Sequence, residues 1–243
     1  AGALGDSRRL KLLRGMFVVG QGALAVSLLC GAGLMLKSVY RLQSIELGYS
    51  TDHRLTVGAH RKYDPKASLN ESNAAILERL SVIPGVVSAA QTTTSPGGGA
   101  SLVGIKTTGP GEPQAFSGYL FRITANYFET MGMSLVAGRG FAGMHKGDRP
   151  VMIIDEVTAA KYFPKGNAIG GTLMMDKIPL EIVGVVKPVV LGIPGKFVAT
   201  AVNGKPITAQ FYLPIWQAGR QSSLEALLRM SQRPSPDLKA MTR

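Results

Sequence analysis

The chain has 243 residues, a formal net charge of +12 and one cysteine. This length allows a membrane segment plus one or two compact domains, and a single cysteine excludes a disulfide within the chain. Residues 1–51 carry six basic and two acidic side chains, and the basic residues elsewhere form no basic and aromatic cluster. The charge therefore favours membrane lipid as a partner at the N-terminal segment and excludes nucleic acid.

Residues 15–36 carry no charge and only two polar side chains, Gln21 and Ser27. A helix of this length spans roughly 33 Å, which matches the hydrocarbon core of a bilayer at about 30 Å. The stretch therefore predicts a transmembrane helix. Basic residues are denser before it than after it, so the positive-inside rule places residues 1–14 in the cytoplasm.

A cleaved signal peptide, including a lipoprotein signal, and a buried core helix are the alternatives to a membrane span for this stretch. A cleaved signal peptide has a shorter apolar segment, of about 7 to 15 residues. A lipoprotein signal at Cys30 would need a small residue where Leu28 and Leu29 stand. A buried core helix rarely combines this length with basic residues at both ends. The many glycines and alanines indicate close packing against other helices.

After the apolar stretch, Val39, Leu42 and Ile45 keep a helical spacing that ends near Gly48. We predict that residues 37–53 form a stalk that continues the membrane helix. Because the chain begins with Ala and not Met, we expect it to be a fragment of a longer protein.

Residues 54–94 predict a strand, a helix and a second strand. Alternating apolar residues from Leu55 give the strand period, Asp64 and Pro65 open a helix, and Pro84 and Gly85 end it. The loop at 95–100 follows.

Short strands dominate residues 102–216, and two short helices interrupt them. Thr124 is predicted to cap the first helix, which Gly132 ends, and Asp155 to cap the second, which Pro164 ends. The fold class expected for the whole is α+β. Predicted strands are 103–108, 118–123, 134–137, 151–154, 172–176, 180–187 and 210–214, with a last one at 224–228.

No motif in the sequence predicts chemistry. Gly138 to Gly143 match GxGxxG, but no helix can follow them before Pro150, and no Walker motif occurs. The three histidines have no metal-ligand spacing, and the carboxylates suit caps and strand edges better than acid–base catalysis. We therefore expect no catalytic, cofactor-binding or metal-binding residue, and no ATPase activity in this chain.

Five ordered segments together resemble the MacB-like permeases of bacterial ABC transporters, which are related to FtsX and to the lipoprotein-releasing permeases. The resemblance implies an α+β periplasmic core over residues 54–232, in which residues 54–94 and 222 onward form one part and about 102–216 an inserted part. Residues 233–243 then begin a further helix. The segments are LLRGMFVVGQGALAVSLLCGAGLMLKSVYRLQ, ERLSVIPGVVSAA, ITANYFETMGMSLVAGRGF, VMIIDEVTAAKYFPKGNAIGGTL, and IVGVV with FYLPIWQ.

The resemblance also implies a function and partners. The chain would belong to a bacterial inner-membrane permease whose periplasmic core transmits ATP-driven movement for export. Its partners would be an ABC ATPase, a second permease copy or related permease subunit, and a periplasmic adaptor. A membrane-anchored periplasmic hydrolase and a signal-anchored binding module are the alternatives, and the loop at 188–206 has no assigned role.

The residues singled out are structural. Three glycines are expected to permit turns, one proline to end a helix, and four aromatic residues to anchor the short helices by burial. They are Gly85, Gly132, Gly138, Pro164, Tyr127, Phe128, Tyr162 and Phe163.

Overall fold

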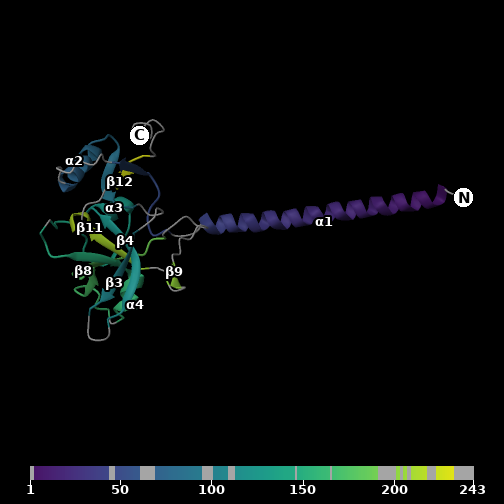
Figure 1. The fold of residues 1–243 in the computed structure, drawn as a ribbon. Helices are drawn as coiled ribbons and strands as arrows, with labels where there is room; N and C mark the ends of the chain where they lie inside the picture. The colour runs from purple at the N-terminus through teal and green to yellow at the C-terminus, as the bar shows by residue number, and fades with distance from the viewer. Residues whose placement is uncertain are drawn as a thin grey trace. The chain divides into compact units, whose positions relative to one another are not determined.

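The chain divides into two units, residues 1–46 and 47–243. The structure is a computed structural model (Figure 1). It describes residues 3–43, 47–60, 69–94, 101–108, 113–145, 147–164, 166–190, 201–202, 205–206, 209–217 and 223–232.

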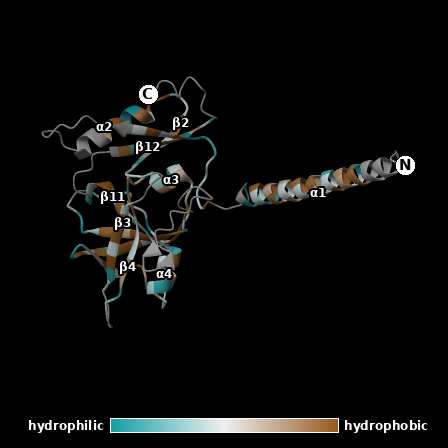
Figure 2. Cartoon of the chain, turned by 45° about the vertical axis from the view of Figure 1, so that its right-hand side comes forward, coloured by the Kyte–Doolittle hydropathy of each residue, from teal (hydrophilic) through white to brown (hydrophobic). Residues whose placement is uncertain are grey.

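The first unit is one helix, α1 (Ala3–Gln43), of 41 residues. At 1.5 Å per residue it is about 60 Å long. Within it, Leu12–Arg41 is long and apolar enough to cross a membrane, and no other helix in the described part of the chain meets this test. Figure 2 shows apolar residues along most of its length, and none of the candidate span is buried by the protein. Exposure of so many apolar side chains to water would be costly, so lipid or other helices must cover them.

The second unit begins with a three-stranded antiparallel sheet. Strand β12 (Ser223–Met230) lies between β1 (Arg54–His60) and β2 (Val86–Thr92), although it comes last in the sequence. Helix α2 (Leu69–Ser81) covers one face through contacts of Leu77 and Leu80 with a small apolar core. The predicted start of this helix at Asp64 lies outside the described residues.

The other strands close into a six-stranded barrel. Each strand pairs with two neighbours, and the ring is completed where β3 pairs with both β4 and β7. Two of the six pairs are parallel, β4 with β11 and β6 with β8. The barrel strands are β3 (Ser101–Thr107), β4 (Ala115–Ile123), β6 (Val151–Asp155), β7 (Thr172–Met175), β8 (Ile178–Val186) and β11 (Gln210–Pro214).

Alternation along the barrel strands creates two cores. One core takes residues from all six strands and fills the barrel, as Leu120 and Met152 do. The neighbouring residues Phe121 and Ile153 point the other way, into a second core that packs against helix α3 (Tyr127–Met131). The barrel joins the three-stranded sheet through one pairing, Thr92 with Ile123.

Smaller elements complete the unit. Strand β5 (Leu135–Gly138) pairs with β8, helix α4 (Glu156–Tyr162) follows β6, and a 3-10 turn η1 (Ile215–Gln217) follows β11. Two-residue strands β9 (Ala201–Val202) and β10 (Lys205–Pro206) pair with each other within the loop that the sequence left unassigned. The predicted helix at 233–243 lies outside the described residues.

The expected α+β class is confirmed, but one helix start is wrong. Helix α3 has Asn126 as its N-cap and not Thr124. The Thr124 hydroxyl oxygen instead accepts a hydrogen bond from the Gln91 N–H at 2.9 Å. The Thr124 side chain therefore bonds to Gln91, a strand residue distant in sequence, and does not cap the helix.

Candidate functional site

The segment that follows α1 in the chain, residues 47–54, is held firmly by the core unit. We call it the junction segment. The Val190 N–H donates to the Leu47 carbonyl oxygen at 2.9 Å, and the Ser50 N–H donates to the Met131 carbonyl oxygen at 2.9 Å. Gly48 has φ +78 and packs directly on Pro188 and Val189. Both bonds join the segment to residues far away in the sequence.

Arg54 ties the junction segment to the end of α3. Its Nε donates to the Ser50 carbonyl oxygen at 3.0 Å and its Nη1 donates to the Thr130 carbonyl oxygen. The last carbonyls of a helix lack partners within the helix and carry partial negative charge, so a guanidinium is well suited to this position. Burial, followed by the nearby Arg229 charge, lowers the pKa of Arg54, while Asp52 opposes that shift.

Gly132 makes room for this contact. It ends α3 in the left-handed conformation, φ +64, with its N–H directed at the Glu129 carbonyl oxygen. A Cβ atom at this position would lie 2.9 Å from Arg54 Nη2 and 3.2 Å from Ser50 Cβ. The glycine thus serves both the helix end and the close approach of the junction segment.

Helix α3 is anchored in turn by aromatic packing. Tyr127 is fully buried and Phe128 nearly so, and the Phe128 ring meets the Tyr212 ring edge-on at a centroid distance of 5.2 Å. Tyr49 of the junction segment packs against the same core. Burial raises the pKa of both Tyr49 and Tyr127. Since close-packed interiors deform little, a displacement of the junction segment should move α3 and the core beneath it together.

A buried carboxylate lies deeper in the same unit. Asp155 is completely buried, its Oδ1 accepts bonds from the Gln210 N–H at 3.0 Å and from the Thr158 hydroxyl, and its Oδ2 has no partner. Burial raises the pKa of this carboxyl against those two bonds. Gln210 also bonds both backbone groups of Val189, next to the point where Val190 holds the junction segment.

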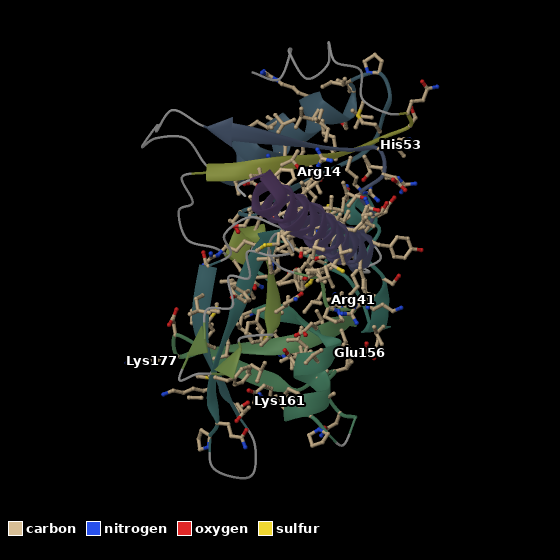
Figure 3. The ribbon with its side chains drawn as sticks, turned by 90° about the vertical axis from the view of Figure 1, so that its right-hand side faces the viewer. Arg14, Arg41, His53, Glu156, Lys161 and Lys177 are labelled. Atoms are coloured by element: carbon tan, nitrogen blue, oxygen red, sulfur yellow. The ribbon has the colours of Figure 1, made fainter. Side chains whose placement is uncertain are left out.

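The other predicted structural residues lie at separate places. Tyr162 on α4 stacks on Phe116 of the barrel with ring centroids 3.7 Å apart, and Phe163 packs on the barrel core before Pro164. Glu156 and Lys161, labelled in Figure 3, mark the two ends of this helix. Gly138 lies against the backbone of Val183.

Gly85 lies in the turn before β2, and its carbonyl oxygen accepts a bond from the Ser231 N–H at 2.8 Å. Of the eight predicted residues, only Tyr127, Phe128 and Gly132 belong to α3 and its end. Sequence reasoning missed Arg54, because it has no motif and gains its partners only through the fold. It predicted Asp155 at the start of α4, where the structure has it, but not its complete burial.

The site does not resemble a catalytic centre. Among the described residues, no group of three or more His, Cys, Asp or Glu side chains could hold a metal ion. The Asp155 carboxylate is closed off from solvent, so it cannot reach a substrate. What the arrangement does is attach residues 47–54 to a core rich in aromatic side chains.

Comparison with known sequences identifies a family and a relative. The sequence profile described as "MacB-like periplasmic core domain" matches residues 16–236. The macrolide export ATP-binding/permease protein MacB of Bartonella henselae is 27% identical over 205 residues, which cover 81% of this chain and 27% of that protein. The chain thus spans about a quarter of the length of this relative.

One solved structure shares the fold. The periplasmic region of MacB from Actinobacillus actinomycetemcomitans superposes with a TM-score of 0.52 at 15% identity, covering 83% of this chain and 85% of that one. A domain of a putative permease protein from Porphyromonas gingivalis gives a TM-score of 0.49 at 18% identity, covering 76% and 78%. At these identities the first likeness supports the fold and the second carries no weight.

Proposed function

The chain belongs to the family of MacB-like periplasmic core domains, and we propose that it is one membrane helix and the periplasmic core of a permease in the bacterial inner membrane. Residues 1–14 lie in the cytoplasm and the unit from Leu47 onward in the periplasm. The apolar window Leu12–Arg41 and the denser basic charge before it support this orientation.

The proposed activity is mechanical coupling. An ABC ATPase, on the same polypeptide or a separate subunit, hydrolyses ATP in the cytoplasm, and α1 carries the resulting movement to the junction segment. Arg54 and the bonds at Leu47 and Ser50 then pass it to α3 and the barrel. The observation that carries this proposal is the attachment of residues 47–54 to the core by backbone hydrogen bonds and by the Arg54 side chain, which donates to two carbonyl oxygens. A second permease copy and a periplasmic adaptor are the other proposed partners.

The test separates coupling from hydrolysis. The complete transporter that contains this chain is reconstituted with its ATPase, and ATP hydrolysis and export of a reporter substrate are measured for Arg54→Lys. Lysine keeps the charge but has no planar guanidinium group that can donate to the Ser50 and Thr130 carbonyl oxygens at the same time. We expect export to fall about tenfold, the equivalent of about 1.4 kcal/mol, while most of the ATPase activity remains.

The matched control is Arg139→Lys, because Arg139 is exposed and lies outside the junction. It should leave both activities unchanged. An unaltered ratio of export to hydrolysis in the properly folded Arg54→Lys variant would argue against coupling through this contact. A polypeptide that neither hydrolyses ATP nor copurifies with an ATPase would contradict the wider proposal.

A further inference from the structure

A cleft of about 410 Å³ opens within the core unit beside the junction segment. Its lining is polar and basic. Arg54 and Arg229 supply two guanidinium groups, Ser50 and Ser231 supply two hydroxyls, and Asp52 is the only carboxylate among the lining residues. His53, labelled in Figure 3, also lines it. The proposed coupling role uses Arg54 and Ser50 but assigns no ligand to the cleft that they line.

The sheet register places the two arginines together. Arg54 of β1 lies directly opposite Arg229 of β12, and Arg229 lies opposite Ser88 of β2. Directly opposed residues project from the same face of a sheet. The adjacent Leu228 faces the α2 side, whereas Ser88 shares a 2.6 Å hydrogen bond with the Thr130 hydroxyl, so the arginine row faces α3 and the cleft.

This pairing of like charges is unfavourable in the free protein. Opposed cross-strand pairs of one sign destabilise a sheet, and the Arg229 charge adds to burial in lowering the pKa of Arg54. Within the described part of the chain, the Arg229 side chain makes no hydrogen bond or ion pair, and the Arg54 side chain uses only Nε and Nη1 on backbone carbonyls. Donors on both guanidinium groups are therefore left for another acceptor.

We propose that this cleft binds a phosphate ester, whose phosphate oxygens bridge Arg54 and Arg229. Guanidinium groups recognise phosphate through paired, charge-assisted hydrogen bonds, and donors that converge from several sides suit its tetrahedral oxygens better than a planar carboxylate. The volume exceeds what a bare ion needs, and Val87 and Met230 offer apolar contact to the organic part. A lipid headgroup and a soluble phosphate ester both carry this chemistry.

Two measurements on the full chain distinguish these sources. In neutral detergent, calorimetric titration with glycerol 3-phosphate tests the soluble ester. In nanodiscs of phosphatidylcholine, replacement of part of the lipid by phosphatidylglycerol tests the headgroup, with a rise of about 2–4 °C in melting temperature of the core expected on binding. A response in either experiment supports ligand binding in the cleft and shows whether the phosphate ester is soluble or a lipid headgroup.

Variants assign the response to the cleft. Arg229→Gln should weaken binding at least tenfold, or abolish the lipid-dependent rise, without lowering the melting temperature of the ligand-free protein, because it relieves the repulsion with Arg54. Ser231→Ala, a milder change, should weaken binding about threefold, a loss typical of one hydrogen bond. The exposed Arg149→Gln, outside the cleft, should have no effect. No response to either probe, or equal responses from wild type and folded Arg229→Gln, overturns the proposal.

Discussion

Gly132 combines two constraints in one residue. Its φ of +64 is unfavourable for any residue with a Cβ, and that Cβ would press on Arg54 Nη2. We predict that Gly132→Ala lowers the free energy of unfolding by about 1–2 kcal/mol. Chemical unfolding of the chain in detergent, followed by near-ultraviolet circular dichroism, measures the loss.

Gly140 is the matched control for this prediction. It has no left-handed φ, and nothing lies within 4 Å of the Cβ that alanine would add. Gly140→Ala should therefore change the unfolding free energy by less than about 0.5 kcal/mol. Equal losses from the two variants would show that the helix end at Gly132 is not a special position.

Asp155 makes stability depend on pH. Burial raises its pKa in the folded state above the ordinary value, so between those two values the folded protein binds more protons than the unfolded chain. Stability contributed by this group is then present at low pH and falls as pH rises through the window above about 3.9. Asp155→Asn cannot titrate, so its melting temperature should rise relative to wild type as pH increases from 4 to 7.

The asparagine amide can change stability by an amount that does not depend on pH. Only the pH dependence of the difference from wild type therefore reports the titration of Asp155. Glu156→Gln, next in the chain but exposed, is the control and should follow the wild-type pH dependence. A difference between wild type and Asp155→Asn that does not change with pH would mean that Asp155 does not titrate differently on folding.

Individual residues also show which structural features the sequence predicts and which it does not. The strand period and the apolar spacing around Tyr127 and Phe128 are local patterns, so the sequence alone predicts the strands and the short helix. The Thr124 cap was predicted wrongly because Gln91, more than thirty residues earlier, competes for its hydroxyl. Asp155 was recognised as the residue before a helix, but its burial depends on Gln210 of β11, which no local pattern reveals.

At the scale of elements, closure of the barrel depends on a close contact between β4 and β11. Gly118 on β4 is buried, and a Cβ there would collide with the Phe211 ring and lie 2.7 Å from the Ala209 carbonyl oxygen. Strand backbone cannot move aside without breaking the parallel pairing. We predict that Gly118→Ala destabilises the core by about 2–3 kcal/mol, within the range for overpacked cores, measured by thermal unfolding.

The paired strand offers the control. Gly104 on β3 pairs with Ser117, the residue before Gly118, but has nothing within 4 Å of an added Cβ. Gly104→Ala should be neutral or slightly stabilising, since alanine restricts the unfolded chain. If both variants lost the same stability, the β4–β11 contact would not limit the packing of the barrel.

The elements themselves were largely predictable, but their pairing was not. Alternation at Leu55 and Val57 and apolar runs at 151–154 and 180–187 predicted strands that the structure contains. The parallel pair β6–β8 and the closing pair β3–β7 join segments distant in sequence, with hydrogen bonds that leave no trace in local periodicity. The sequence therefore predicted a strand-rich region without showing that it closes on itself.

At the scale of the whole molecule, contacts between distant parts of the sequence organise the core. Strand β12 returns to lie between β1 and β2, and the junction segment is held by residues near 131 and 190. The junction segment is thus attached to core residues that lie about 80 to 140 positions later in the sequence. In the proposed coupling, a movement applied at Leu47 would therefore act on the core at two places that are distant in the sequence.

The proposed topology can be tested because Cys30, inside α1, is the only cysteine of the chain. In a Cys30→Ala background, we introduce Val82→Cys, whose site is exposed on the core unit, or Ser7→Cys in the cytoplasmic segment. Bacteria with a permeabilised outer membrane are treated with a membrane-impermeant maleimide. Residue 82 should react in intact cells and residue 7 only after the inner membrane is lysed, because the charged reagent cannot cross the lipid that α1 spans.

Phe121→Cys, fully buried in the core, controls for folding and should react only after denaturation. Labelling of residue 7 but not of residue 82 in intact cells would reverse the orientation and place the core on the same side as the ATPase, where transmission across the membrane would have no meaning.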